Sequence, residues 1–573
     1  MKKTLPFILS LLIFSFYSCS NADESEGAEI LKEVPPALEP VIEGMFGDFL
    51  VPADTVVLSD FIAQKLAWTE SEIPISINGQ TLFDFEEVSS AYASRQFKAL
   101  WIVSELADSV FAELAEIEND GLLASDYLLP QINDLREELE KSDEKDLSKW
   151  AELDILLTNA MLKYGKHLLE GKLDPTSLDE FWNFTKRESP QALGKLLATA
   201  HDSADLKLFF KAVRPQNHLY LNMRKSLQTY KLHVDSGGWN RVVWTSKKSK
   251  LEPGDTNAIV PDLRSRLALE FFLDSANYAT DSVYDTTLQG AIAKFQVAHG
   301  LYPDSIVGKS TISLLNISAQ EKVDAILVNL ERLRWSIGNL GGNYILVNAA
   351  EYRLWFFQED TVTWQTEVII GAPYTATPFF MSELQSVVFN PTWTLPYSIA
   401  SKEMLPKLRA DAGCLAKQNM ILMDREGKTI DPSSVDFNKV SRSKFPYIIR
   451  QQPGKTNSLG VVKFVMPNTY SIYLHDTPSK ALFKREERAF SHGCIRVNKP
   501  LTLAEKVLVK NENWYSDSIQ SILNTGQTTQ IRLDTSIPVL LLYITHYTNV
   551  HGQAYFFKDV YGMDKKVADA LKR

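Results

Sequence analysis

The sequence predicts a multidomain α+β protein, and three features support this fold class. Apolar residues follow a helical period from about residue 85 to 235, and a compact helical unit occupies residues 252–318. From residue 343 onward the period changes to two, which is typical of strands. A chain of 573 residues predicts about four domains at roughly 150 residues each. With 45% hydrophobic and 23% charged residues, the composition excludes a disordered, collagenous or coiled-coil protein.

The N-terminus predicts export. Two lysines at positions 2 and 3 precede an uncharged, mostly apolar run over residues 5–17, which is too short to span a bilayer but suits a signal peptide. We therefore expect a signal peptide over residues 1–19. Cys19 at its end resembles the lipidated cysteine of bacterial lipoproteins, which implies an exported protein in the periplasm or outer membrane of a Gram-negative bacterium. Cleavage without lipidation is the alternative.

A helical domain is predicted over residues 81–250, after a tether and domain start at 20–80. Its two clearest apolar stripes end at glycines, at Gly121 and at Gly171. The stripes consist of Leu106, Val110, Phe111, Leu114 and Ile117, and of Leu153, Leu156, Leu157, Ala160 and Tyr164. No chemically reactive residues gather there, so we interpret this region as structural.

A small three-helix domain is predicted over residues 251–320. Leu263, Leu267 and Phe271 begin one apolar helix face, and Gly300 is a stop signal for the next helix. The run AIAKFQVAHGLYPDSIVG resembles the peptidoglycan-binding-like domain of cell-wall enzymes, with Ser305 in place of the usual glycine. The resemblance implies contact with glycan, and a spacer role is the alternative.

The C-terminal third predicts a mainly β domain over residues 340–565. Residues 344–348, 352–357, 385–396, 460–468, 470–476, 537–547 and 554–562 carry the strand pattern. Residues 398–458 interrupt it as a lysine-rich insertion, and insertions of this length often cover active sites.

Charge and cysteine content exclude other classes of protein. The net charge is −11, so there is no basic excess to neutralise a nucleic-acid backbone. Three cysteines cannot form a disulfide framework.

The strongest chemical signal lies between residues 474 and 500. His475 precedes Cys494 by nineteen residues, and His492 precedes it by two. An imidazole near a thiol can accept its proton and leave a nucleophilic thiolate. Gly493 permits a tight turn that would aim the N–H groups of Gly493 and Cys494 at a developing oxyanion. This chemistry predicts acyl transfer through a thioester.

Two other interpretations of these residues are open. A single cysteine is more often an inert small hydrophobe, and this is our interpretation of Cys414, which has no histidine nearby in sequence. His475, Asp476, His492 and Cys494 could instead bind a metal, but the paired spacings typical of zinc sites are absent.

HDTP followed by SHGCIRV resembles the signature of the L,D-transpeptidases, cysteine enzymes that remodel peptidoglycan. The similarity extends to FNPTWTLPYSI, to QQPGKTNSLGVVKFVMPN and, in the helical domain, to AELDILLTNAMLKYGKHLLEGKLDP, as in the large multidomain branch of the family. It implies a helical scaffold domain, a peptidoglycan-binding-like domain, and a catalytic domain in which residues 398–458 form a substrate-capping subdomain.

The resemblance also implies roles for single residues. Cys494 corresponds to the nucleophile and His475 to its base. Asp476 corresponds to a residue whose backbone carbonyl orients the histidine, and Tyr473 directs a hydroxyl toward the site. Gly493 and His492 correspond to the oxyanion segment. The substrate-binding residues implied are Arg496, Ser491, Trp393 and Asn457. Arg496 would pair with a substrate carboxylate, with a structural ion pair as its alternative, and Trp393, Asn457 and Gly460 would shape the cleft or serve the fold.

The function implied is a peptidoglycan L,D-transpeptidase that releases D-Ala from a tetrapeptide stem and forms 3→3 cross-links. Neither a cofactor nor a metal is expected. The expected partners are donor and acceptor stem peptides, the membrane through a lipid anchor, and carbapenem inhibitors, but no nucleic acid. The same site could use water, as a peptidase, or a protein amine, as a protein-to-wall ligase. The non-enzymatic alternative is an inactive scaffold that binds the cell wall.

Overall fold

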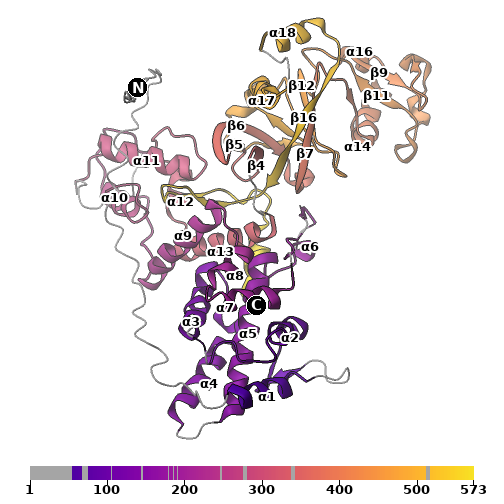
Figure 1. Cartoon of the computed structure of the whole chain (residues 1–573). Coiled ribbons are helices and arrows are strands. Elements are labelled where there is room, and N and C mark those ends of the chain that lie inside the picture. The colour runs from indigo at the N-terminus through magenta and orange to yellow at the C-terminus, as the bar shows by residue number, and fades with distance from the viewer. Residues whose placement is uncertain are drawn as a thin grey trace, which may run out of the picture. The chain divides into compact units, whose positions relative to one another are not determined.

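The computed structural model describes residues 55–573, except 68–74, 103, 105, 143–145, 179, 185, 190, 246–247, 275–280, 337–341 and 512–515. The predicted signal peptide, Cys19 and most of the tether therefore lie outside the described residues. Within the described part, no helix has both the length and the apolar character needed to cross a membrane. The fold class is confirmed: a helical N-terminal region precedes a β-rich domain (Figure 1).

The N-terminal region packs around one long helix, α5 (Leu147–Glu170). Asp146 caps this helix by accepting a hydrogen bond from the Lys149 N–H, and the helix ends at Gly171. The predicted second stripe is fully buried, and α5 contributes much of the first hydrophobic core. The helices around it are α1 (Thr55–Lys65), α2 (Phe85–Ala93), α3 (Ala107–Ala115), α4 (Leu129–Lys141), α6 (Pro175–Leu178), α7 (Leu193–Asp202), α8 (Lys207–Val213) and α9 (His218–Asp235).

A buried charged helix, α13 (Ala319–Ser336), connects the parts of the fold. Its Glu331, Arg332 and Arg334 are completely buried. Arg334 donates to the Asp120 carbonyl at 2.7 Å, and Arg332 pairs with Asp564 at 2.6 Å. Two buried arginines of this helix therefore tie it to the N-terminal helices through a hydrogen bond and to the C-terminal part through an ion pair.

The small helical unit contains α10 (Val260–Ala268), α11 (Thr286–Ala298) and α12 (Lys309–Leu315). Leu263 and Leu267 are buried as predicted, but Phe271 is 74% exposed, so its assignment to that face was wrong. The helix ends at Ala268, and Phe271 has a φ of 61°. The reversal puts Phe272 into the core in its place.

The large β-sheet closes on itself. Its strand order is β12-β13-β15-β6-β5-β4-β16-β7, and β12 pairs again with β7, so the sheet forms a ring. β3 (Trp182–Asn183), from the helical region, extends β7. The strands are β4 (Tyr344–Asn348), β5 (Arg353–Gln358), β6 (Thr361–Gly371), β7 (Phe379–Phe389), β12 (Val462–Val465), β13 (Leu474–His475), β14 (Ala489–Ser491), β15 (Ile495–Val497) and β16 (Thr529–Leu542).

The insertion predicted at residues 398–458 folds as a unit with its own core, and this unit begins earlier than predicted, since Trp393 and Leu395 also belong to it. β8 (Trp393–Thr394), β9 (Met420–Met423), β10 (Thr429–Ile430) and β11 (Ile448–Gln451) form a separate four-stranded sheet. These strands lie with α14 (Tyr397–Ile399), α15 (Leu405–Ala410) and α16 (Cys414–Lys417), as Figure 1 shows for β9, β11, α14 and α16. The core of this inserted unit includes Leu405, Leu422 and Ile449.

Most of the predicted strand at 537–547 lies in β16, and the chain leaves the large sheet after β16. β17 (His546–Thr548) and β18 (Ala554–Phe556) form their own hairpin, which packs with residues of α9 and α13. The α17 (Pro500–Leu508), α18 (Ser516–Thr525) and α19 (Asp564–Leu571) helices complete the C-terminal part.

Candidate active site

Adjacent parallel strands bring the predicted nucleophile and base together. β13 and β15 pair with His475 opposite Arg496, and the Ile495 N–H donates to the Tyr473 carbonyl at 3.1 Å. Because alternate residues of a strand share a face, Tyr473 and His475 lie on the same side of the sheet as Cys494 and Arg496. Residues separated by nineteen positions in sequence thus become neighbours.

The imidazole of His475 is held by a backbone carbonyl. His475 is 5% exposed, and its Nδ1 lies 2.5 Å from the carbonyl oxygen of Asp476. Nδ1 must carry the proton to donate to a carbonyl, which leaves Nε2 as an acceptor. Burial, assisted by the charge of Arg496, lowers the pKa of His475 to about 3. The residue is therefore a neutral base at physiological pH.

The side chain of Asp476 holds the segment that supplies this carbonyl. Its carboxylate accepts from the Val461 N–H at 2.9 Å and pairs with the Lys480 ammonium. Gly460 lies so close that a β-carbon there would overlap the carboxylate. The orienting group is thus the carbonyl, and the side chain supports it.

The thiol of Cys494 is subject to opposing influences. It is half-buried, and burial raises its pKa. Hydrogen bonding to Tyr473 and the charges of Lys463 and Arg496 act in the opposite direction. The Tyr473 ring lies 5.6 Å from the His475 ring, centroid to centroid. The phenol therefore contacts both members of the predicted catalytic pair.

The turn before Cys494 corrects part of the oxyanion prediction. Gly493 has a φ of 113°, which favours glycine, but its N–H donates to the Ser491 hydroxyl at 3.1 Å. That hydroxyl in turn donates to the Cys494 carbonyl at 2.6 Å. The Gly493 N–H is therefore engaged. In the described part of the chain the Cys494 N–H has no acceptor, so it is the donor free to meet an oxyanion.

Ser491 and Asn457 make their hydrogen bonds within the protein, which agrees with the fold alternative for Asn457, and substrate contact by either residue stays a prediction. Ser491 is buried, and both its hydrogen bonds brace the turn. Asn457 is 1% exposed and donates to the carbonyls of Pro391 and Gln452 at 3.0 and 2.9 Å. Both residues shape the loops around the site.

His492 is directed toward the inserted subdomain. Its ring is half exposed, and its Nε2 lies 2.9 Å from the Glu403 carboxylate. Glu403 belongs to η5 (Ala400–Met404) of the insertion. His492 therefore connects the cysteine loop to the predicted cap, and its side chain is not positioned as an oxyanion donor.

Two predicted residues remain oriented toward the site. The Arg496 side chain forms no ion pair within the described residues, so the structural alternative for it lacks a partner. Trp393 on β8 is half-buried and lies near Tyr473, whose pKa it lowers against the larger upward effect of burial. Cys414, by contrast, lies in the insertion, where burial raises its pKa.

Sequence reasoning missed residues that brace the cysteine loop from a distance. Thr377 donates to the Gly493 carbonyl at 2.8 Å, and Thr375 donates to the Ser491 carbonyl at 2.9 Å. Tyr561 supports Thr377 in turn: its hydroxyl accepts from the Thr377 N–H at 3.3 Å and donates to the Gly371 carbonyl at 2.8 Å. No local sequence signal marks these residues. The two threonines lie more than a hundred positions before the cysteine motif, and Tyr561 lies some seventy positions after it.

Lys463 on β12 was also missed. Its Cα is in register with His475, and its Nζ lies 3.8 Å from the centroid of the Tyr473 ring. It places a second positive charge beside Arg496 on the face that holds Cys494.

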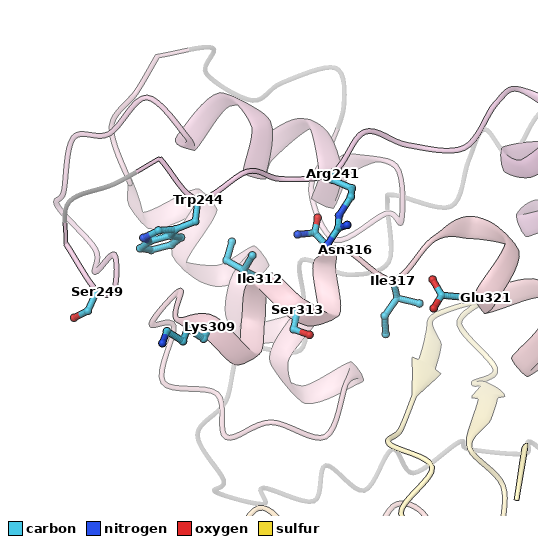
Figure 2. Close-up of a pocket in the computed structure, with 9 residues that line it drawn as sticks. All are labelled: Arg241, Trp244, Ser249, Lys309, Ile312, Ser313, Asn316, Ile317 and Glu321. Carbon is cyan, nitrogen blue, oxygen red and sulfur yellow. The ribbon is translucent and has the colours of Figure 1, made fainter. Parts of the chain in front are cut away.

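A separate hollow lies in the small helical unit, away from the cysteine. It has a volume of about 590 Å³, and Figure 2 shows Trp244 and Ile312 on one part of its lining and Arg241 beside Asn316 on another. Ser249, Lys309, Ser313, Ile317 and Glu321 complete the lining. Glycan contact by this domain stays a prediction, as does its spacer alternative.

Cys494 and the carbonyl-oriented His475 lie on one face of the closed β-sheet. Residues 342–520 match the family model of the L,D-transpeptidase catalytic domain, and residues 86–227 match that of the Scaffold domain. The chain therefore contains an L,D-transpeptidase catalytic domain, and a Scaffold domain precedes it.

The chain is also similar to a curated protein that is named as an L,D-transpeptidase. A putative L,D-transpeptidase of Haemophilus influenzae is 36% identical over 225 residues, which are 39% of this chain and 45% of that protein. The chain thus spans less than half the length of this relative. L,D-transpeptidase structures from Xylanimonas cellulosilytica and Stackebrandtia nassauensis are 15% and 14% identical. Each alignment covers 52% of this chain and 98% or 97% of the other, with TM-scores of 0.17 and 0.21, which are too low to establish a shared fold.

Proposed function

We propose that the protein is a peptidoglycan L,D-transpeptidase that forms 3→3 cross-links through a thioester on Cys494. The observation that carries the proposal is the placement of Cys494 beside a buried, neutral His475 with an available Nε2. The donor is a tetrapeptide stem, and the scissile amide joins the L-centre of its third residue to the terminal D-Ala.

The reaction proceeds in two balanced steps. His475 Nε2 accepts the thiol proton as Cys494 Sγ attacks the amide carbonyl, and the Cys494 N–H stabilises the oxyanion. The C–N bond then breaks, a C–S bond remains, and the imidazolium returns its proton to the departing amine of D-Ala. In the second step the side-chain amine of another stem attacks the thioester and loses its proton to His475. The C–S bond breaks, and the imidazolium returns that proton to the Cys494 thiolate.

Arg496 is suited to orient the donor. A guanidinium binds a carboxylate through two parallel hydrogen bonds, and stem peptides carry several carboxylates. Its partial burial strengthens such a pair relative to one in open solvent. The absence of a carboxylate partner within the described residues leaves it available for substrate.

Export and anchoring form part of this proposal and rest on the sequence alone. A lipid-modified Cys19 followed by a tether would hold the enzyme at a membrane from which it reaches the wall. Substituting Cys19 with serine removes the thiol that would carry the lipid, so the acyl chains detected by mass spectrometry on the wild type should be absent from the variant.

The test is mass spectrometry of a purified disaccharide-tetrapeptide incubated with the wild type and with Cys494→Ala. The proposal predicts a dimer that has lost one D-Ala, formed only by the wild type. A Cys494-dependent tripeptide without dimer would indicate a peptidase or a missing protein acceptor. No Cys494-dependent change would contradict acyl transfer on peptidoglycan and favour the inactive scaffold.

A further inference from the structure

Lys463 is a charged residue in the interior of the catalytic sheet. β12 lies between β7 and β13, and Lys463 is in register with Val388 on one side and His475 on the other. Residues in register on neighbouring strands project from the same face. The ammonium therefore belongs to the face that holds the cysteine, although it is distant from the motif in sequence.

The surroundings of Lys463 are unusual for a lysine at such a position. Partly buried ammonium groups normally pair with a carboxylate. Lys463 forms no ion pair within the described residues, and its Nζ instead lies 3.8 Å from the centroid of the Tyr473 ring. Burial lowers its pKa, while the ionised form of Cys494 raises it. The charge is thus held in place by an aromatic ring that also reaches the thiol.

The groups that face the Cys494 thiol come from three strands. They are Tyr473 and His475 of β13, Lys463 of β12 and Arg496 of β15. Both cations and the Tyr473 side chain lower the pKa of the Cys494 thiol and so favour the thiolate. An ammonium on the face of a phenol is attracted by the ring and draws electron density from the hydroxyl, which makes that hydroxyl a better donor.

We propose that Lys463 is a positioning residue that keeps Cys494 reactive, because its charge on the Tyr473 ring favours the thiolate. This inference rests on Cys494 being the nucleophile of the proposed function. The rival explanation is that the lysine stem only fills space between strands while its ammonium reaches toward water. The two explanations differ in whether the positive charge of Lys463 affects the reactivity of Cys494.

The test measures alkylation of Cys494 in the full chain by iodoacetamide from pH 6 to pH 11, with each cysteine quantified by peptide mapping. The variants are Lys463→Met and Lys463→Gln, which remove the charge, and Lys463→Arg, which keeps it. Lys484→Met, at an exposed lysine of η9 (Lys480–Lys484), removes one charge elsewhere. Cys414 serves as an internal control in every sample.

The neutral variants should shift the midpoint of the Cys494 profile upward by about one pH unit, which is about tenfold slower alkylation below the midpoint. The rate at high pH should be unchanged, Lys463→Arg should stay within about threefold of the wild type, and Lys484→Met should match it. Cys414 should be unaffected throughout.

The proposal fails if the midpoint does not move in the neutral variants, or if Lys463→Arg moves it equally. It also fails if both neutral variants lose the folded state while Lys463→Arg keeps it, because Lys463 would then be structural. The assay contains no peptidoglycan, so a shift in a protein without cross-linking activity would leave this inference intact while refuting the proposed function.

Discussion

The His475 imidazole and the Asp476 backbone carbonyl are joined by a 2.5 Å hydrogen bond between consecutive residues. The orienting group for the histidine is therefore built into the main chain. No carboxylate side chain performs this task, unlike in Ser-His-Asp triads, where replacing the aspartate costs about 10⁴-fold in kcat.

Asp476→Asn should consequently be a mild substitution. Asparagine keeps an oxygen that accepts from the Val461 N–H and leaves the backbone carbonyl in place, so kcat should fall by less than about tenfold. Asp476→Ala should cost more, because the Val461 N–H loses its acceptor. Steady-state kinetics of both variants measures this, and a loss of about 10⁴-fold in Asp476→Asn would show that the carboxylate itself orients His475.

Gly460→Ala should destabilise the catalytic domain. A β-carbon at this position would overlap the Asp476 carboxylate, and the φ of 60° is itself unfavourable for alanine. We expect a loss of about 2–4 kcal/mol in the free energy of unfolding. Gly427→Ala is the matched control, since Gly427 also has a positive φ but no backbone or carboxylate nearby, and should lose only about 1 kcal/mol. Equal unfolding midpoints in the two variants would contradict the close approach to Asp476.

His492→Ala should leave the chemical step nearly intact. The ring pairs with Glu403 in a half-exposed ion pair, which contributes about 1 kcal/mol or less. Turnover should therefore stay within about threefold of the wild type, and Glu403→Gln should behave alike. Removing a true oxyanion donor costs about 10²–10³-fold in kcat, so a loss of that size in His492→Ala would return His492 to the oxyanion hole.

The folded protein should lose stability as the pH falls from about 6.5 toward 3. Burial lowers the pKa of His299, His475 and His546 to about 3, so the unfolded chain binds protons in this range that the folded chain does not. Each such histidine makes the free energy of unfolding fall by about 1.4 kcal/mol per pH unit. Burial raises the pKa of Glu351 to about 8. Between this value and its pKa in the unfolded chain, Glu351 binds a proton only in the folded state, which cancels the effect of one histidine on stability. Urea midpoints at pH 7 and pH 5 test this, and a higher midpoint at pH 5 would contradict it.

The sequence predicted the elements whose signals are local. The stripes of the helical region, the strand at 344–348, the strand predicted at 352–357 and found at 353–358, and the turn at Gly493 all follow from periodicity or from one residue's conformational needs. The family motif also indicated Cys494 and His475, whose register the structure now supplies.

Other features depend on contacts that periodicity does not encode. The charges of Arg332 and Arg334 suggest an exposed helix, yet both side chains are buried. Burial is possible because Asp564, near the C-terminus, pairs with Arg332, and Glu331, on the same helix, pairs with Arg334. Lys463 likewise gave no signal, because only the pairing of β12 with β13 brings it to the site. The end of α10 before Phe271 depends on a backbone reversal that the apolar spacing does not reveal.

The central claim is that Cys494 becomes acylated, and intact-protein mass spectrometry after exposure to a carbapenem tests it most directly. The account predicts one adduct per chain, mapped by peptide digestion to Cys494, absent from Cys494→Ala and not found on Cys414. An adduct on Cys414, or none in the folded wild type, would contradict the assignment of Cys494 as the nucleophile.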